Sequence, residues 1–345
     1  MAQISNTEKV NVYVPEKTGA SLKRDAELFE IFRSDGKKIN LNRFLSNLIV
    51  GYYNGYKQER NTKTAEVKQI VFPYLRDKKN QDAVAEEIME NVILPEVPRR
   101  KGKNPVRLSL KPTLETDQTI TEIIQATGPD QSLSQYLYRM FMSYSEKPVY
   151  ERERIIFRSR VRFLEEACSD HSEITFATPN NPGLIHHVIP YELVSGPDET
   201  FNYLLCQEHS VFHQQNEAKS YRLCRINRPG YYHTSGTLEE SVVQYMEKMK
   251  RIAPQFSINE EKEICVRLTP PGQRSYRMVY TGRPSPDRIE TGRDDECSLY
   301  YFSCSQEQVY RYFLRFNVGE ASVMYPAELR KRIYDYYREA MKAYE

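Results

Sequence analysis

The chain has 345 residues, of which 39% are hydrophobic and 28% are charged, and its formal net charge is only +2. This length predicts roughly two to four domains with buried cores, and the balanced charge excludes binding of nucleic acid through net charge alone. Any such affinity must come from local patches. No apolar run is long enough for a membrane span or a signal peptide. The six cysteines form no Cys-x-x-Cys pair. We therefore expect a reduced, cytoplasmic protein.

The amino-terminal residues predict a strand and two helices. Residues 10–14 alternate apolar and polar side chains, and Pro15 ends this strand. Residues 21–33 carry a helical apolar stripe, and Gly36 follows as a helix-ending glycine. Asn40 is suited to cap a second helix. A strand, a helix, a glycine turn and a helix in this order resemble a ribbon-helix-helix unit, in which two strands pair and enter the DNA major groove.

The same pattern recurs at residues 106–146. Residues 106–111 predict a strand, Pro112 and Thr113 open a helix, and Ser132 is suited to cap the next one. The outward side chains of this strand suit contact with bases or phosphates, and they are Arg107, Ser109 and Lys111. The two repeats could pair within one chain or across a homodimer. Alternatively, the ribbon is an interaction scaffold that contacts no nucleic acid.

A basic linker separates the two repeats. It carries Arg99, Arg100, Lys101 and Lys103 among prolines. We interpret this run as solvated rather than as a phosphate clamp, because nothing holds the side chains in place.

The centre of the chain predicts an Arg-rich helix followed by a small sheet. The helix covers residues 150–167, and a second helix covers 238–252. Strand-length apolar runs bounded by turn residues lie between them, at 172–178, 187–194, 201–212 and 219–226. Short strands with tight turns predict a strongly bent sheet or a barrel.

These strands resemble a known family. Asn202-Tyr203-Leu204 lies where the WYL domain carries Trp-Tyr-Leu, and residues 188–194 and 221–226 match its flanking strands. Over about residues 150–251 the chain resembles a WYL domain, which implies an Sm-like β-barrel. It departs from the pattern in three places: Asn202 replaces the tryptophan, Lys219 replaces an arginine, and His186-His187 stands where the family has a basic pair.

Cations and aromatic residues interleave on the last of these strands. Alternation places Tyr221 on one face and Arg222 on the other. Fixed cations need an anion, a carboxylate partner or water. Together with the resemblance, this pattern predicts a single-stranded RNA site made by His187, Tyr203, Lys219, Tyr221, Arg222 and Arg225. The alternatives are a solvated strand face, or arginines that pair with Glu192 or Glu208.

The last part of the chain predicts a small α+β domain. Its predicted elements are strands at 263–268, 275–280, 298–304 and 321–325, a polar loop at 282–296, and helices at 306–316 and 326–344. The segment at 313–330 resembles the C-terminal extension that mediates oligomerisation after WYL domains. We therefore expect a homodimer built through residues 260–345.

No pattern of a catalytic site is present. The sequence has no Gly-rich phosphate loop, no His-Glu-x-x-His and no nucleophile elbow, so we expect no enzyme and no cofactor. His186 and His187 are adjacent and so face opposite ways on a strand, and His209 and His213 lack a zinc framework, so we expect no metal.

The domain order supplies a functional expectation. It comprises ribbon-helix-helix-like units at 1–104 and 105–149, a WYL domain at 150–252 and a C-terminal module at 260–345. This order resembles the accessory WYL proteins of subtype VI-D CRISPR systems. The resemblance implies a non-enzymatic protein that binds single-stranded RNA and enhances an RNA-guided, RNA-targeting effector nuclease. The alternative is a transcription regulator that binds duplex DNA and senses a ligand.

Overall fold

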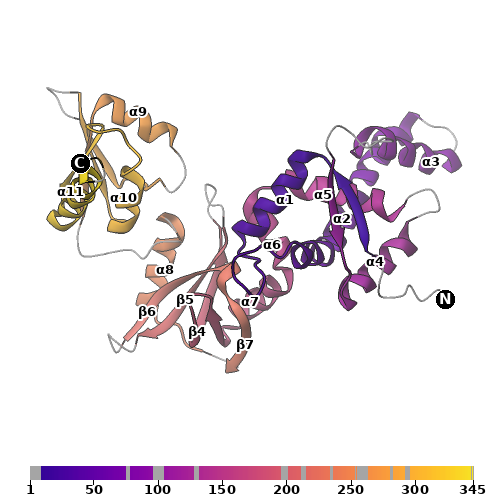
Figure 1. Cartoon of the computed structure of the whole chain (residues 1–345), viewed down its shortest axis with the longest axis horizontal. Helices are drawn as coiled ribbons and strands as arrows, with labels where there is room; N and C mark the ends of the chain where they lie inside the picture. The colour runs from indigo at the N-terminus through magenta and orange to yellow at the C-terminus, as the bar shows by residue number, and fades with distance from the viewer. Residues whose placement is uncertain are drawn as a thin grey trace. The chain divides into compact units, whose positions relative to one another are not determined.

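The structure is a computed structural model of the chain. It describes residues 9–74, 78–95, 105–127, 132–195, 201–210, 215–233, 236–252, 254, 263–279, 283–291, 296–342 and 344. The basic linker and His213 lie outside the described residues. The chain divides into two compact units, Met1–Ser159 and Arg160–Glu345 (Figure 1). The described elements are mixed α+β with three antiparallel sheets, as the predicted fold class requires. The finer domain division at 104, 149 and 252 stays a prediction.

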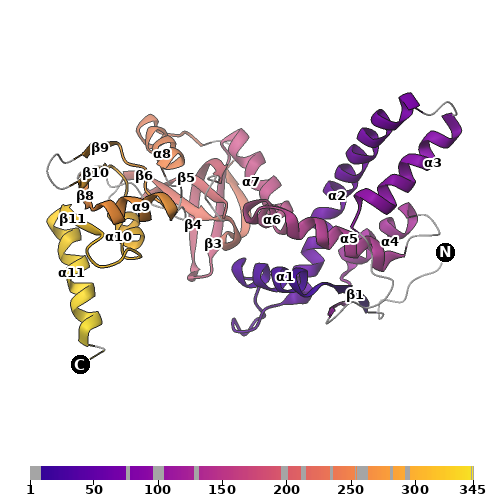
Figure 2. The same ribbon diagram turned by 90° about the horizontal axis from the view of Figure 1, so that it is seen from above.

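The first unit is built from the two sequence repeats, which pair within one chain. Strand β1 (Val10–Val14) runs antiparallel to β2 (Val106–Leu110), with Val10 opposite Leu110. Each strand leads into two helices, which are α1 (Glu16–Leu28), α2 (Leu41–Val71), α4 (Leu114–Ala126) and α5 (Leu133–Glu146). The inserted elements are η1 (Phe72–Tyr74), α3 (Lys78–Ile88) and η2 (Met89–Ile93), and α6 (Val149–Ile156) ends the unit. Figure 2 shows α2 and α3 side by side.

The predicted helix caps in this unit are confirmed. Asn40 accepts a hydrogen bond of 3.0 Å from the Arg43 amide, and Ser132 forms a reciprocal capping box with Gln135. The predicted bounds of the first helix are wrong at both ends. The helix begins at Glu16 rather than at Ser21, and Pro15 is its N-cap. Its first turn is polar and lacks an apolar stripe, so the apolar pattern did not indicate it. The helix ends at Leu28 rather than at Arg33, so Gly36 is not its terminating residue.

The core of the first unit contains a buried ion pair. Asp25 Oδ2 lies 3.1 Å from Arg152 Nε and accepts a hydrogen bond of 3.1 Å from the Tyr144 hydroxyl. All three side chains are buried. Helices α2 and α6 approach closely nearby, where a Cβ at Gly51 would meet the Ile155 carbonyl oxygen. Only glycine permits this approach.

The central sheet of the second unit follows α7 (Arg158–Asp170). Its strands are β3 (Glu173–Thr178), β4 (Asn181–Val194), β5 (Tyr203–Ser210), β6 (Gln215–Arg222) and β7 (Asn227–His233), in the order β6-β5-β4-β3-β7. The 3₁₀ turn η3 (Leu223–Arg225) joins β6 to β7, and α8 (Glu240–Ile252) packs on β4, β5 and β6.

Two expectations for this region need correction. The predicted Sm-like barrel is not closed: closure needs a ladder between the edge strands β6 and β7, and the described residues form an open sheet. The turn η3 ends β6 at Arg222, and β7 then pairs with β3 instead. The single helix expected at 150–167 is two helices, because the chain departs from helical geometry at Phe157, where φ is −109° and ψ is 29°.

A second sheet forms near the carboxyl end of the chain. Its elements are β8 (Ile264–Leu268), α9 (Pro270–Met278), β9 (Arg288–Thr291), β10 (Ser298–Phe302), α10 (Gln306–Phe313), β11 (Ala321–Tyr325) and α11 (Ala327–Lys342), with strand order β11-β8-β10-β9. The strand predicted at 275–280 is wrong, because Thr269 caps a helix there whose first turn contains Pro270 and Pro271. The loop predicted at 282–296 contains β9. Within the described residues, no helix has the length and apolar character needed to cross a membrane.

Candidate nucleic-acid interface

The ribbon of the first unit presents the predicted polar residues outward. Arg107 and Ser109 are exposed on β2, and the Arg107 Nε donates a hydrogen bond of 3.0 Å to Asn11 on β1. The Asn42 side chain holds the backbone of Lys111 through bonds of 2.7 and 3.1 Å. The start of α2 therefore fixes the end of β2, and with it the position of the ribbon.

The predicted site on the central sheet is divided between two faces. Lys219 and Tyr221 share one face of β6, and Arg222 lies on the other, opposite Tyr203 of β5. Arg225 lies in η3, beyond the end of the strand. The structure therefore does not gather these residues into one patch, and their contribution to RNA binding stays a prediction.

Tyr221 belongs to a packed polar cluster. Its hydroxyl donates a hydrogen bond of 2.5 Å to Glu208 and lies 3.0 Å from His186 Nδ1, which is 2.8 Å from Glu208. The Tyr221 ring also packs edge-on against Phe176, with centroids 4.9 Å apart. Burial, followed by the contact with the Glu208 carboxylate, raises the pKa of Tyr221 well above its usual range. Tyr221 is half-buried, and these contacts hold its ring and hydroxyl in place.

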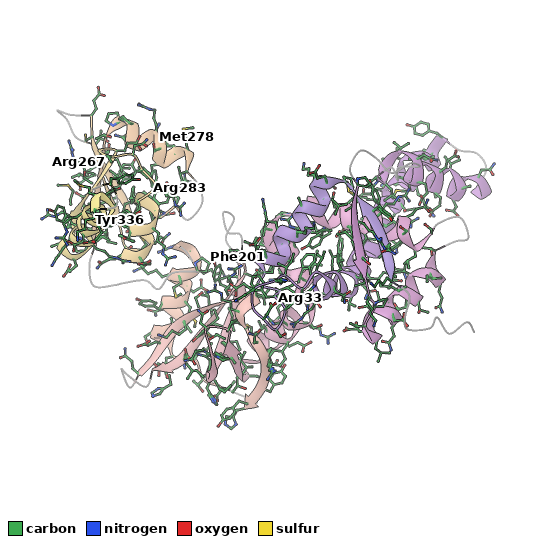
Figure 3. The ribbon with its side chains drawn as sticks, in the orientation of Figure 1. Arg33, Phe201, Arg267, Met278, Arg283 and Tyr336 are labelled. Atoms are coloured by element: carbon green, nitrogen blue, oxygen red, sulfur yellow. The ribbon has the colours of Figure 1, made fainter. Side chains whose placement is uncertain are left out.

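The other predicted residues of the sheet also have neighbours. Lys219 pairs with Glu217 at 2.5 Å. The Arg222 guanidinium lies 3.2 Å from the centroid of the Phe201 ring, labelled in Figure 3. Tyr203 packs against the core between the sheet and α8. Of the carboxylates considered as arginine partners, Glu208 is engaged by Tyr221 and His186, and Glu192 pairs with Lys250 at 2.6 Å.

His187 lies on a part of the sheet face that remains exposed. It is next to Thr175 of β3, which in turn is next to Gly230 of β7. The Tyr232 ring meets the His187 ring edge to face, with ring centroids 4.6 Å apart, and Tyr232 is 53% exposed. A Cβ at Gly230 would meet nothing within 4 Å. We call these four residues, His187, Thr175, Gly230 and Tyr232, the open face.

The sequence patterns did not predict strand β7, and they therefore did not identify Tyr232 as a residue of the open face. Pro229 and Gly230 are residues typical of a turn, so the sequence here did not indicate the strand that the structure contains. The usable signal was the run of three rings that follows, Tyr231-Tyr232-His233, all of them exposed. The ring of Tyr231 packs against that of Phe163 of α7, with ring centroids 4.6 Å apart. Arg228 is a further exposed cation on β7.

No metal site is evident in the described part of the chain, where no group of three or more His, Cys, Asp or Glu side chains could hold an ion. His209 Nδ1 lies 3.2 Å from the Asn216 side chain. The exposed rings and cations of the central sheet can bind a ligand by stacking and by charge.

Comparison with known proteins gives a likeness in fold. No protein-family model matches the chain, and no curated protein matches its sequence. The structure is similar to one described as "Crystal structure of a CRISPR Cas-related protein", with 17% identity, a TM-score of 0.69, and coverage of 99% of this chain and 96% of that chain. Proteasome accessory factor B/C (PafBC) of Arthrobacter aurescens aligns over 67% of this chain and 35% of its own, at 13% identity. Its TM-score of 0.25 is too low to indicate a common fold. The chain therefore shares its fold, over nearly its whole length, with the CRISPR Cas-related protein.

Proposed function

We propose that the protein is a non-enzymatic accessory protein that binds single-stranded RNA and enhances an RNA-guided, RNA-targeting CRISPR effector nuclease. The CRISPR context is supported by the likeness in fold to a CRISPR Cas-related protein over 99% of the chain. RNA binding is supported by the exposed rings of His187 and Tyr232 on the open face. Neither role needs a cofactor.

Stacking and charge would act together in this proposal. Unpaired bases have exposed π faces, and an exposed aromatic side chain binds them with little sequence preference. A duplex buries those faces, so the open face favours single strands. The net charge is only +2, so phosphate contacts must come from individual cations such as Arg228, which is exposed on β7. Each phosphate contact with a single strand should add about 0.7 to the salt slope of binding.

A second candidate function is binding of duplex DNA through the ribbon. It is favoured by one specific observation: β1 and β2 pair within one chain and present Arg107 and Ser109 to solvent. Paired strands of this kind can enter the major groove. In this alternative the protein is a transcription regulator whose central domain senses a ligand.

A competition experiment distinguishes the two functions. The full chain is mixed with a fluorescent single-stranded RNA at fixed salt, and unlabelled single-stranded RNA, single-stranded DNA and duplex DNA of equal length compete for it. The proposal expects single-stranded RNA to compete best. Displacement mainly by duplex DNA supports the regulator instead. Addition of the protein to an RNA-guided RNA-cleavage reaction, with rate as the readout, tests the accessory role separately.

A further inference from the structure

A groove of about 790 Å³ is lined by strand β6 and helix α8, which are in contact with each other beside it. Six consecutive residues of β6, Gln215 to Ser220, form one of its walls. Because neighbouring residues of a strand point to opposite faces of a sheet, a wall made of consecutive residues is the edge of the strand. The groove therefore runs along the backbone of β6.

This edge has hydrogen-bonding capacity. Among the described strands, β6 pairs with β5 only and is the last strand on its side of the sheet. An edge strand presents alternate backbone N–H and C=O groups that can pair with another extended chain. At about 3.3 Å per residue, six residues span about 20 Å, so a peptide of similar length can pair along the whole wall.

The opposite wall supplies apolar contacts. Val242 and Met249 of α8 are buried and form its base, and Tyr245 is half-buried beside them. Ala218 of β6 packs against the same cluster. In an added strand, every second side chain would point toward these residues, so apolar residues at alternate positions fit this wall.

The polar lining is slightly acidic. Its charged residues are Glu217, Glu239 and Lys219, which leave one net negative charge. Lys219 pairs with Glu217, and Glu239 accepts a hydrogen bond of 2.6 Å from Asn216. Such a lining favours a ligand with Lys or Arg and disfavours phosphate. A second copy joined through its own β6 would bring two linings of the same sign together.

We propose that this groove binds an extended segment of a partner protein, which adds to the sheet as a strand beside β6. The segment alternates apolar side chains, which face α8, with neutral or basic ones. Backbone pairing gives the affinity, and the apolar wall selects the sequence. This peptide site is separate from the open face and independent of the proposed RNA binding.

The test uses a phage-displayed library of random octapeptides and the immobilised full chain. Ser241→Trp fills the groove, because Ser241 is an exposed lining residue of α8. Gln244→Trp is the matched control, since Gln244 is exposed on the same helix and does not line the groove. We expect enriched peptides with alternating apolar and basic residues, whose affinity falls about tenfold or more with Ser241→Trp and is kept with Gln244→Trp.

The best peptide is then N-methylated at one set of alternate amides, or at the other set. Pairing with β6 predicts that one set abolishes binding and the other has little effect, because only one set faces the edge. The proposal is overturned if no peptide is enriched, if both tryptophan variants bind equally, or if both methylation patterns act alike. A Ser241→Trp variant that instead loses RNA affinity, or loses self-association, assigns the groove to RNA or to a second copy.

Discussion

His187 of β4 and Tyr232 of β7 meet edge to face across the intervening strand β3, with ring centroids 4.6 Å apart and an interplanar angle of 89°. An edge-to-face pair leaves ring faces that the partner does not cover. Helix α8 packs over β4, β5 and β6, whereas Tyr232 and His187 remain exposed. The pair therefore offers surface for a flat ligand such as a base.

Replacement of Tyr232 by alanine should weaken RNA binding. Loss of one stacking aromatic costs about 1–3 kcal/mol, which corresponds to roughly 5- to 150-fold in Kd. Fluorescence anisotropy with a labelled single-stranded RNA measures this change. Tyr74→Ala is the matched control, because Tyr74 is also exposed and lies in the other unit.

A large side chain at position 230, which covers the open face, should also weaken RNA binding. Gly230→Leu adds a side chain beside Thr175 and His187, where a Cβ meets no neighbouring atom. The thermal melt should be unchanged and the RNA affinity reduced. If both variants bind RNA as the wild type does, while the wild type binds well, the RNA site lies elsewhere on the protein.

Tyr221→Phe should lower stability and leave RNA binding intact. The change removes the hydroxyl that donates to Glu208, within a cluster that includes His186. An unsatisfied, partly buried acceptor costs about 1–3 kcal/mol. Urea unfolding gives the free energy of unfolding, and RNA affinity is corrected for the folded fraction. A loss of corrected affinity with an unchanged unfolding curve would instead place Tyr221 in the binding site.

Asp25 should make stability fall as pH rises. Burial raises the pKa of Asp25 above its ordinary value of 3.8, and the contacts with Arg152 and Tyr144 offset only part of that effect. A carboxyl with a raised pKa in the folded state binds more protons there, so its contribution is greatest at low pH and declines through the folded pKa. The free energy of unfolding of Asp25→Asn, relative to wild type, should therefore increase from about pH 4 toward neutrality. A constant or decreasing difference contradicts this assignment.

Charges on α11 should disrupt the predicted homodimer. Tyr334 and Tyr337 are exposed on α11 and line an apolar groove of about 300 Å³ against β11. Unpaired carboxylates in an interface cost several kcal/mol, so Tyr334→Glu combined with Tyr337→Glu should raise the dimer Kd by about 100-fold or more. Light scattering on the full chain measures the mass. Tyr74→Glu serves as control, and a double variant that remains dimeric places the interface elsewhere.

The ribbon makes a separate prediction. If it contacts duplex DNA, Arg107→Ala with Lys111→Ala should lower the salt slope of DNA binding by about 0.9 for each lost phosphate contact. Lys23→Ala with Lys37→Ala removes two exposed cations from outside the ribbon and should leave the slope unchanged. Equal slopes for the two double variants would mean that the ribbon is scaffold only.

Local signals in the sequence predicted the elements whose ends are set by local chemistry. Asn40 and Ser132 cap helices as expected, because a cap needs only a side-chain oxygen and the amides of the next turn. The residue pattern of α9 instead favoured a strand. Pro270 and Pro271 did indicate the start of a helix, because proline is favoured in the first helical turn.

Long-range pairing was beyond the sequence. Nothing in residues 227–233 shows that β7 returns to β3, and so nothing placed Tyr232 beside His187. The division of the predicted RNA site had the opposite character. The alternation of side chains along a strand already placed Tyr221 and Arg222 on opposite faces. The hydrogen bond from Tyr221 to Glu208 could not be predicted, because it depends on how β5 and β6 pair.

The pairing of β1 with β2 inside one chain makes the ribbon asymmetric. In a ribbon from two identical chains, every substitution occurs twice, related by the two-fold axis, and the matching DNA sequence is a palindrome. Here Tyr13 lies opposite Arg107, and Asn11 lies opposite Ser109. A mutation can therefore change one half of the ribbon surface without changing the other. A ligand that fits this surface does not need two halves related by a two-fold axis.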